Sequence, residues 1–240
     1  MNQQNETPGL IKWTGYLALT LLLVLPLSVL TVRSGAWQQG LLLYALACLG
    51  STALMILSIT LLLLPRFAAW RKGVAQRAVF ALPGTLLLLG LVSGGESPRI
   101  HDITTDTADP PEFTMALEQR GAGANALEID PDVILQQQAA YPDLQTLLSP
   151  LTIDEVYDRA LQVTKELGWE VYHQDRNTGV IEAVDTTRIM AFKDDVVIRV
   201  RSNAQGTLLD LRSVSRVGEG DIGANTKRIR AFLTAFQQQE

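Results

Sequence analysis

The first 95 residues contain three long apolar runs, whereas the rest of the chain alternates short apolar runs with polar turns. A bilayer core of about 30 Å is crossed by about 20 apolar residues of helix, at about 1.5 Å per residue. The runs cover residues 13–32, 40–64 and 78–93. The pattern therefore predicts a three-helix transmembrane anchor over residues 1–95.

The first run has an alternative interpretation as a cleaved signal peptide. It is long for a signal peptide, and no small-x-small cleavage site follows it, so we favour a retained span. None of the three runs contains Asp, Glu, Lys, Arg or His. Because ion and proton pathways usually need such groups, the pattern favours an anchor or a partner-binding surface over a transporter.

Residues 96–150 show little periodicity and are interrupted by prolines. Their composition, rich in Pro, Asp, Thr and Gln, predicts an extended, partly ordered connector that wraps the domain behind it.

Regular patterns begin at Thr152. The sequence Thr152-Ile-Asp-Glu155 has the form of a capping box, and apolar residues then recur at helical spacing until Gly168. Alternating runs predict strands at 169–174, 180–186, 188–193, 196–201 and 207–215, with Asp194 and Asp195 as a hairpin turn. Ile229, Phe232, Leu233 and Phe236 form one stripe of a last helix.

These elements predict the fold class. Glycine-bearing turns between strands indicate hairpins, and hairpins give a mostly antiparallel sheet. With about five strands and two helices, residues 151–240 should form a soluble α+β two-layer sandwich, with both helices on one face of the sheet.

Charge separates the two halves of the chain. Residues 1–95 carry six cations and one anion, and residues 96–240 carry 14 cations and 24 anions. So acidic a domain should repel nucleic acid. The single cysteine, Cys48, excludes an intramolecular disulfide and a thiolate zinc site. The sequence indicates no cofactor.

The cations also predict the orientation. Four of them lie between the second and third runs, and only Arg33 lies between the first and second. The positive-inside rule places the four-cation loop and the N-terminus in the cytoplasm. We therefore expect a multi-pass protein of the bacterial inner membrane, with its C-terminal domain in the periplasm.

A glycine-rich loop between the last strand and the last helix is the main candidate site. Gly218, Gly220 and Gly223 allow unusual backbone conformations, and a helix N-terminus attracts anions. Arginine side chains suit phosphate or carboxylate. One interpretation is a pocket for a small anionic ligand; the other is that Asp221 itself caps the helix and pairs with an arginine. The candidate ligand-binding residues are Arg212, Ser213, Ser215, Arg216, Gly218, Asp221, Asn225 and Arg228, with Asp194, Asp195, His101 and Asp102.

Other chemistry has weaker support. His101, Asp102 and Asp106 are metal-compatible residue types, but their spacing leaves too few ligands, so we expect no metal site. No nucleophile elbow, HExxH motif or Ser/Cys–His pair of recognisable spacing is present. Catalysis is therefore less expected than binding.

The residues resemble a known family. Phe192 followed by Asp194-Asp195, and the run Arg212-Ser-x-Ser-Arg-x-Gly-x-Gly-Asp-x-Gly-x-Asn-x-x-Arg-Ile229, are similar to the signature of domain of unknown function 1499. His101-Asp102 with its neighbours and Pro110-Pro111 resembles the opening of its three-span membrane branch. The resemblance covers about residues 97–236 and implies no reaction. A cysteine-containing segment found in many members is absent here, so a redox role does not carry over.

Three functions follow as hypotheses. The first is a membrane-tethered, envelope-facing accessory domain that binds a partner protein or a small anionic ligand. The second is an envelope hydrolase that joins Arg212, Arg216 and Asp221 to His101 or Asp194. The third is a structural subunit of a membrane complex. The expected partners are the lipid bilayer, a membrane or envelope protein, and a small anion.

Overall fold

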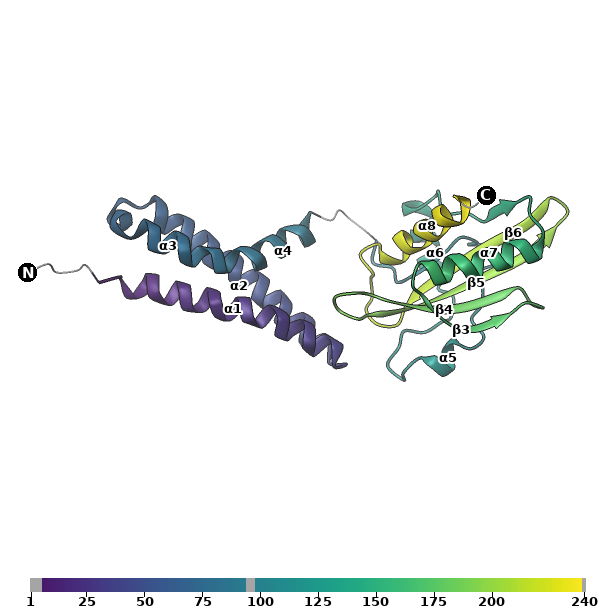
Figure 1. The fold of residues 1–240 in the computed structure, drawn as a ribbon, viewed down its shortest axis with the longest axis horizontal. Coiled ribbons are helices and arrows are strands. Elements are labelled where there is room, and N and C mark those ends of the chain that lie inside the picture. Colours follow the sequence, from purple (N-terminus) through teal and green to yellow (C-terminus); the bar gives the residue numbers. More distant parts are fainter. Residues whose placement is uncertain (1–5, 94–97, 239–240) are drawn as a thin grey trace, which may run out of the picture. The chain divides into compact units, whose positions relative to one another are not determined.

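The structure, a computed structural model, describes residues 6–93 and 98–238. Contacts between residues divide the chain into two compact units, residues 1–95 and residues 96–240 (Figure 1).

The first unit consists of helices. α1 covers Gly9–Arg33 and α2 covers Trp37–Leu63. The third segment runs through η1 (Pro65–Trp70), α3 (Arg71–Ala78), η2 (Val79–Ala81) and α4 (Leu82–Val92). Three helices, Gly9–Arg33, Trp37–Leu63 and Pro65–Val92, are long and apolar enough to cross a membrane.

The third helix is longer than the sequence indicated. We expected a loop before residue 78, but the cationic stretch from Pro65 is helical. Pro65 stands in the first turn, where its missing N–H costs nothing. Val74 then packs with Ile11 of α1 and Leu61 of α2 in one buried cluster. This buried contact gives the polar stretch an apolar side, which a loop prediction from charge alone misses.

The second unit contains one sheet of six strands, all of whose pairings are antiparallel. Its strands are β1 (Asp102–Thr104), β2 (Leu147–Ser149), β3 (Glu170–Asp175), β4 (Val180–Thr186), β5 (Lys193–Asn203) and β6 (Gly206–Ser215). The order is β1-β6-β5-β4-β3, and β2 also pairs with β6. The predicted α+β fold with an antiparallel sheet is thus confirmed.

Two helices, α7 (Ile153–Glu166) and α8 (Ala224–Gln237), cover one face of this sheet (Figure 1). The predicted capping box at the start of α7 is confirmed, with both of its reciprocal hydrogen bonds. The predicted stripe of α8 is buried at Ile229, Phe232 and Phe236. Phe232 stacks on Trp169 at 5.6 Å between ring centroids. Each fully buried aromatic or aliphatic side chain contributes about 1.5–3 kcal/mol, so this layer is the hydrophobic core.

The other face of the sheet carries charges, because side chains alternate between the two faces along a strand. We call it the charged face; its main residues are Glu182, Asp195, Arg199, Arg201, Asp210 and Arg212. Residues 105–129, which we call the cover segment, supply most of the contacts with these groups and include the short helix α5 (Ala116–Gln119). The helix α6 (Pro131–Ala140) follows.

The stretch treated as an extended connector in the sequence analysis is thus a structural part of the domain. It contributes β1 and β2, which both pair with β6, as well as the cover segment. Because β6 lies about 110 residues after β1 and about 60 residues after β2, no local sequence pattern indicates these pairings.

Two expectations about residues 188–195 were wrong. The strand predicted at 188–193 is a turn from Thr187 to Phe192, in which Ala191 has φ 56°. The amide of Thr187 donates to the carbonyl of Phe192 at 2.8 Å, and the amide of Phe192 donates to the hydroxyl of Thr187 at 2.9 Å. The predicted turn residues Asp194 and Asp195 lie inside β5 and are buried. Arginines neutralise both carboxylates, which is what allows them to occupy a buried strand.

Candidate functional site

Arg212 of β6 is a fully enclosed charge on the charged face, with 2% of its surface exposed. Its Nε and Nη2 donate to the two oxygens of Asp102 at 3.0 and 2.6 Å. The guanidinium also donates to the carbonyls of Pro111 and Leu127 and lies over the ring of Phe113. These contacts bind the cover segment to the sheet.

Arg216 forms a similar pair with Asp195. Its Nε and Nη2 donate to the two oxygens of the carboxylate at 3.0 and 2.7 Å. Arg120 of the cover segment lies 3.1 Å from the same carboxylate, and 3% of its side chain is exposed. Burial lowers the pKa of Arg120, and the charge of Asp195 opposes that shift. One carboxylate thus holds two arginines.

Arg228 of α8 lies on the helix-covered face. It pairs with Asp185 at 2.7 Å and Asp194 at 2.5 Å, and its Nη1 donates to Ser213 and Asn225. Burial raises the pKa of Asp194, and the nearby Arg228 charge opposes that shift. This cluster ties α8 to β4, β5 and β6.

Asn225, at the start of α8, connects this cluster to β1. Its Nδ2 donates to the hydroxyl of Ser215 at 2.9 Å and to the carbonyl of His101 at 3.0 Å. The candidate residues Ser213, Ser215, Asn225 and Arg228 are therefore together, and their polar groups bond to one another and to the two aspartates.

The glycine-rich loop is closed by its own aspartate. The Oδ1 of Asp221 accepts from the amide of Gly223 at 2.8 Å, and its Oδ2 accepts from the amide of Asn225 at 2.5 Å. Gly218 and Gly223 have φ of 91° and 75°, a region that favours glycine. Asn125 donates to the carbonyl of Gly218. Asp221 thus stands where a bound anion would meet the first amides of α8, in agreement with the capping part of the second interpretation. The expected pairing with an arginine is not observed, because Arg212, Arg216 and Arg228 pair with Asp102, Asp195 and Asp194.

The residues of the hypothetical hydrolase site are distributed over separate clusters. Arg212 pairs with Asp102, Asp194 pairs with Arg228, and Asp221 caps α8. His101 lines a small cavity of about 180 Å³ with Asp102. Within residues 6–93 and 98–238, no three His, Cys, Asp or Glu side chains lie together as metal ligands would.

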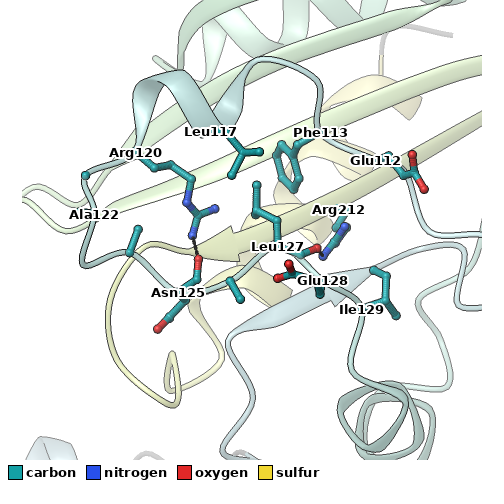
Figure 2. Close-up of a pocket in the computed structure, with 13 residues that line it drawn as sticks. Glu112, Phe113, Leu117, Arg120, Ala122, Asn125, Leu127, Glu128, Ile129 and Arg212 are labelled. Carbon is teal, nitrogen blue, oxygen red and sulfur yellow. Dashed lines mark hydrogen bonds between the residues drawn. The ribbon is translucent and has the colours of Figure 1, made fainter.

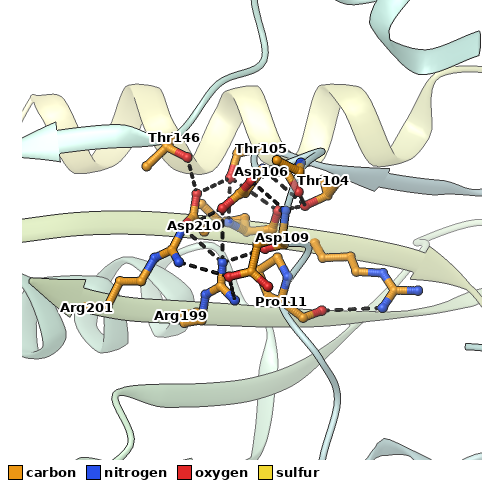
Figure 3. Close-up of polar contacts among 12 residues, drawn as sticks. Thr104, Thr105, Asp106, Asp109, Pro111, Thr146, Arg199, Arg201 and Asp210 are labelled. Carbon is orange, nitrogen blue, oxygen red and sulfur yellow. Dashed lines mark hydrogen bonds and ion pairs between the residues drawn. The ribbon is translucent and has the colours of Figure 1, made fainter. Parts of the chain in front are cut away.

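A second ionic cluster fixes the beginning of the cover segment. Asp210, fully buried, accepts from the hydroxyls of Thr105 and Thr146 at 3.1 and 2.6 Å. Figure 3 shows Arg199 and Arg201 beside it, and both also reach Asp106 and Asp109. Two arginines of the sheet therefore lie among three aspartates, one from the sheet and two from the cover segment.

The middle of the cover segment is held by a buried glutamate. Glu182 of β4 accepts from the backbone amide of Thr114 at 2.6 Å and from that of Met115 at 3.1 Å, and it also accepts from the hydroxyl of Thr114. The carboxylate thereby meets amides at the start of α5, where anions are stabilised.

Between these attachments the cover segment forms a cleft of about 610 Å³ (Figure 2). Its lining combines apolar side chains with four charged ones: Glu112, Phe113, Leu117, Arg120, Ala122, Ala124, Ala126, Leu127, Glu128, Ile129 and Arg212, with Gly121 and Asn125. Leu117 is 73% exposed. Sequence reasoning missed this cleft; the only local signal was a short periodic stretch at residues 113–120.

Comparison with known proteins gives the family. Residues 102–236 match the family described as "Protein of unknown function (DUF1499)". No curated protein matches the chain. The match spans more than half of the chain and includes the sheet, the cover segment and the glycine-rich loop. The protein therefore belongs to the DUF1499 family.

Proposed function

We propose that this protein is a membrane-tethered binding module whose soluble domain holds a segment of a partner protein without turning it over. The three apolar helices serve as the anchor. The excess of cations between the second and third apolar runs supports an orientation in which these cations lie on the cytoplasmic side and the soluble domain lies in the periplasm.

The cleft under the cover segment is the observation that carries the proposal. Its volume of about 610 Å³ lies within the usual range of about 300–1,000 Å³ for binding pockets. Phe113, Leu117, Leu127 and Ile129 give it an apolar lining. Within this lining Leu117 and Ile129 are 73% and 38% exposed, so they offer apolar surface that a partner can cover.

The charges at the cleft favour one class of partner. Arg212 is balanced by Asp102, whereas Asp195 balances only one of the two positive charges of Arg120 and Arg216. The side chains of Arg120 and Arg212 are only 3% and 2% exposed, so they offer little positive charge to a ligand. Glu112 and Glu128 are exposed and form no ion pair with any residue that the structure describes. An apolar segment flanked by lysine or arginine therefore complements the cleft, whereas a small anion does not. The excess of anions over cations in residues 96–240 also favours a positively charged partner.

A labelled model peptide of leucines flanked by lysines tests the proposal. Fluorescence anisotropy with the full chain in neutral detergent should show binding that weakens at least ten-fold in Leu117→Asp. The double variant Glu112→Gln, Glu128→Gln should also weaken it. Matched changes elsewhere, Leu135→Asp on α6 and Glu170→Gln on β3, should leave binding unchanged; both residues are exposed.

Two results would contradict the proposal. Equal loss of binding in the Leu135→Asp control would show that the peptide binds the acidic surface without using the cleft. Binding of citrate or phosphate that is abolished by Leu117→Asp would assign the cleft to small anions instead.

A further inference from the structure

One end of the helical unit collects cationic side chains from several elements. It is the end where α1 begins, α2 finishes and α3 packs between them, with Ile11, Leu61 and Val74 in one buried cluster. The cations near this cluster are Lys12, Arg66, Arg71, Lys72 and Arg77. The only acidic residue in residues 1–95 is Glu6.

Arg77 is built into the junction of α3 and α1. A Cβ atom on Gly15 would lie 2.6 Å from the Cδ of Arg77, so the missing side chain of Gly15 makes room for the arginine stem. The Nη1 of Arg77 donates to the carbonyl of Gly73 at 2.9 Å. The guanidinium is thus held by packing at a helix junction, one helical turn from the buried Val74.

Most of the positive charge at this end has no acidic partner in the part of the chain that the structure describes. Arg71 donates to the carbonyl of Leu62 at 2.9 Å, near the end of α2, where carbonyls lack helical partners. Lys12, Arg66 and Lys72 are exposed and pair with no carboxylate among residues 6–93. At least these three charges remain available to a ligand.

The surroundings of the cations fit a lipid. Trp13 and Tyr16 form an edge-to-face pair beside Lys12, and Trp70 precedes Arg71; such rings settle at the depth of headgroups. Leu10, Leu17 and Leu63 present apolar surface at the same end, with 47%, 50% and 74% exposed. Acyl chains can cover that surface, but a free anion cannot.

We propose that this cationic end binds the phosphate headgroup of an anionic membrane lipid. Basic pockets between membrane helices recognise such headgroups. The lysines and the Arg77 guanidinium provide the charge, and the neighbouring leucines contact the acyl chains. This inference rests on the membrane insertion proposed above and is independent of the cleft.

Native mass spectrometry of the full chain in neutral detergent tests the inference, with equal amounts of phosphatidylglycerol and phosphatidylcholine added. The wild type should retain phosphatidylglycerol preferentially. Each neutralised cation should lower that affinity about five-fold, so Lys12→Gln with Lys72→Gln should lower it about 25-fold. The control Arg33→Gln, at the other end of α1, should keep the preference.

Three outcomes overturn the inference. They are equal retention of the two lipids by the wild type, an equal loss in Arg33→Gln, and displacement of phosphatidylglycerol by an equal concentration of inorganic phosphate. Extraction of membranes with alkaline carbonate separates the two proposals. Release of the wild type would refute membrane insertion itself, whereas a retained protein without lipid preference would refute only the headgroup site.

Discussion

Asp195 accepts hydrogen bonds from Arg216 through both of its carboxylate oxygens, at 3.0 and 2.7 Å, and it has no exposed surface. Arg120 reaches the same carboxylate from the cover segment at 3.1 Å. One strand residue therefore joins the sheet, the beginning of the glycine-rich loop and the cover segment. Removing one member of such a buried group leaves charges without a counterion.

Replacing Asp195 with Asn should destabilise the domain by about 3–5 kcal/mol, because the enclosed Arg120 and the partly exposed Arg216 both remain charged without a counterion. Chemical unfolding of the full chain in detergent measures the change. The matched control is Asp143→Asn, which breaks the exposed pair between Asp143 and Arg230 and should cost about 0–1 kcal/mol. Equal costs for the two variants would contradict the buried ion pair.

Two glycines with similar backbone angles should respond differently to alanine. Gly168 and Gly179 have φ of 78° and 71°. Gly168→Ala meets no atom within 4 Å and should cost about 1–2 kcal/mol, the strain of the left-handed conformation. At Gly179 the new Cβ would lie 2.1 Å from the carbonyl oxygen of Val200, so the cost should be clearly larger. Thermal unfolding compares them, and a similar loss in both would refute the close approach.

Asp221 can be tested as a cap rather than a ligand residue. Asp221→Ala removes the acceptor for the amides of Gly223 and Asn225 and should cost about 1 kcal/mol. Asp221→Asn should recover only part of that stability, since its single amide oxygen can accept from the amide of Gly223 or of Asn225 but not from both. Urea midpoints of the two variants decide the question, and an Asn variant as unstable as the Ala variant would argue for a charge-specific contact.

The capping box of α7 should make stability depend on pH. Hydrogen bonds from the amide and hydroxyl of Thr152 lower the pKa of Glu155 in the folded protein. A lowered folded pKa gives a contribution that is present above the unfolded value of about 4.3 and is lost as the pH falls through the folded pKa. The difference in unfolding midpoint between the wild type and Glu155→Gln should therefore shrink from pH 6 to pH 3. A constant difference over that range would contradict the assignment.

Local sequence patterns predicted those parts of the fold that depend on contacts between residues close together in the sequence. The capping box at Thr152, the hairpin between the strands predicted at 169–174 and 180–186, and the apolar stripe of α8 all follow from residues a few positions apart. Asp194 and Asp195 were misplaced because the groups that make them acceptable in a strand, Arg228 and Arg216, lie 34 and 21 residues later. A carboxylate pair without those partners resembles a turn.

The candidate site was harder to predict for the same reason. The sequence identified the arginines around the glycine-rich loop as candidate site residues, but it did not identify their partners. Those partners come from distant segments: Arg212 contacts Asp102, which lies 110 residues earlier in the chain. The cleft is built from the cover segment, whose residues 121–129 show no regular period. Its shape depends on attachments at Glu182 and Asp195 that only the folded sheet provides.

β6 pairs with β1 and β2, which come early in the domain, and with β5, which directly precedes it. These pairings determine the order in which the domain can form during synthesis. β1 and β2 leave the ribosome about 60–110 residues before the strand with which they pair. Until β6 arrives, Asp102 has no Arg212 beside it, and both short strands lack the strand with which they pair. Contacts so distant in sequence are slow to form. A nascent or truncated chain that ends before residue 206 therefore leaves this segment open to proteases, and completion of the last 35 residues protects it.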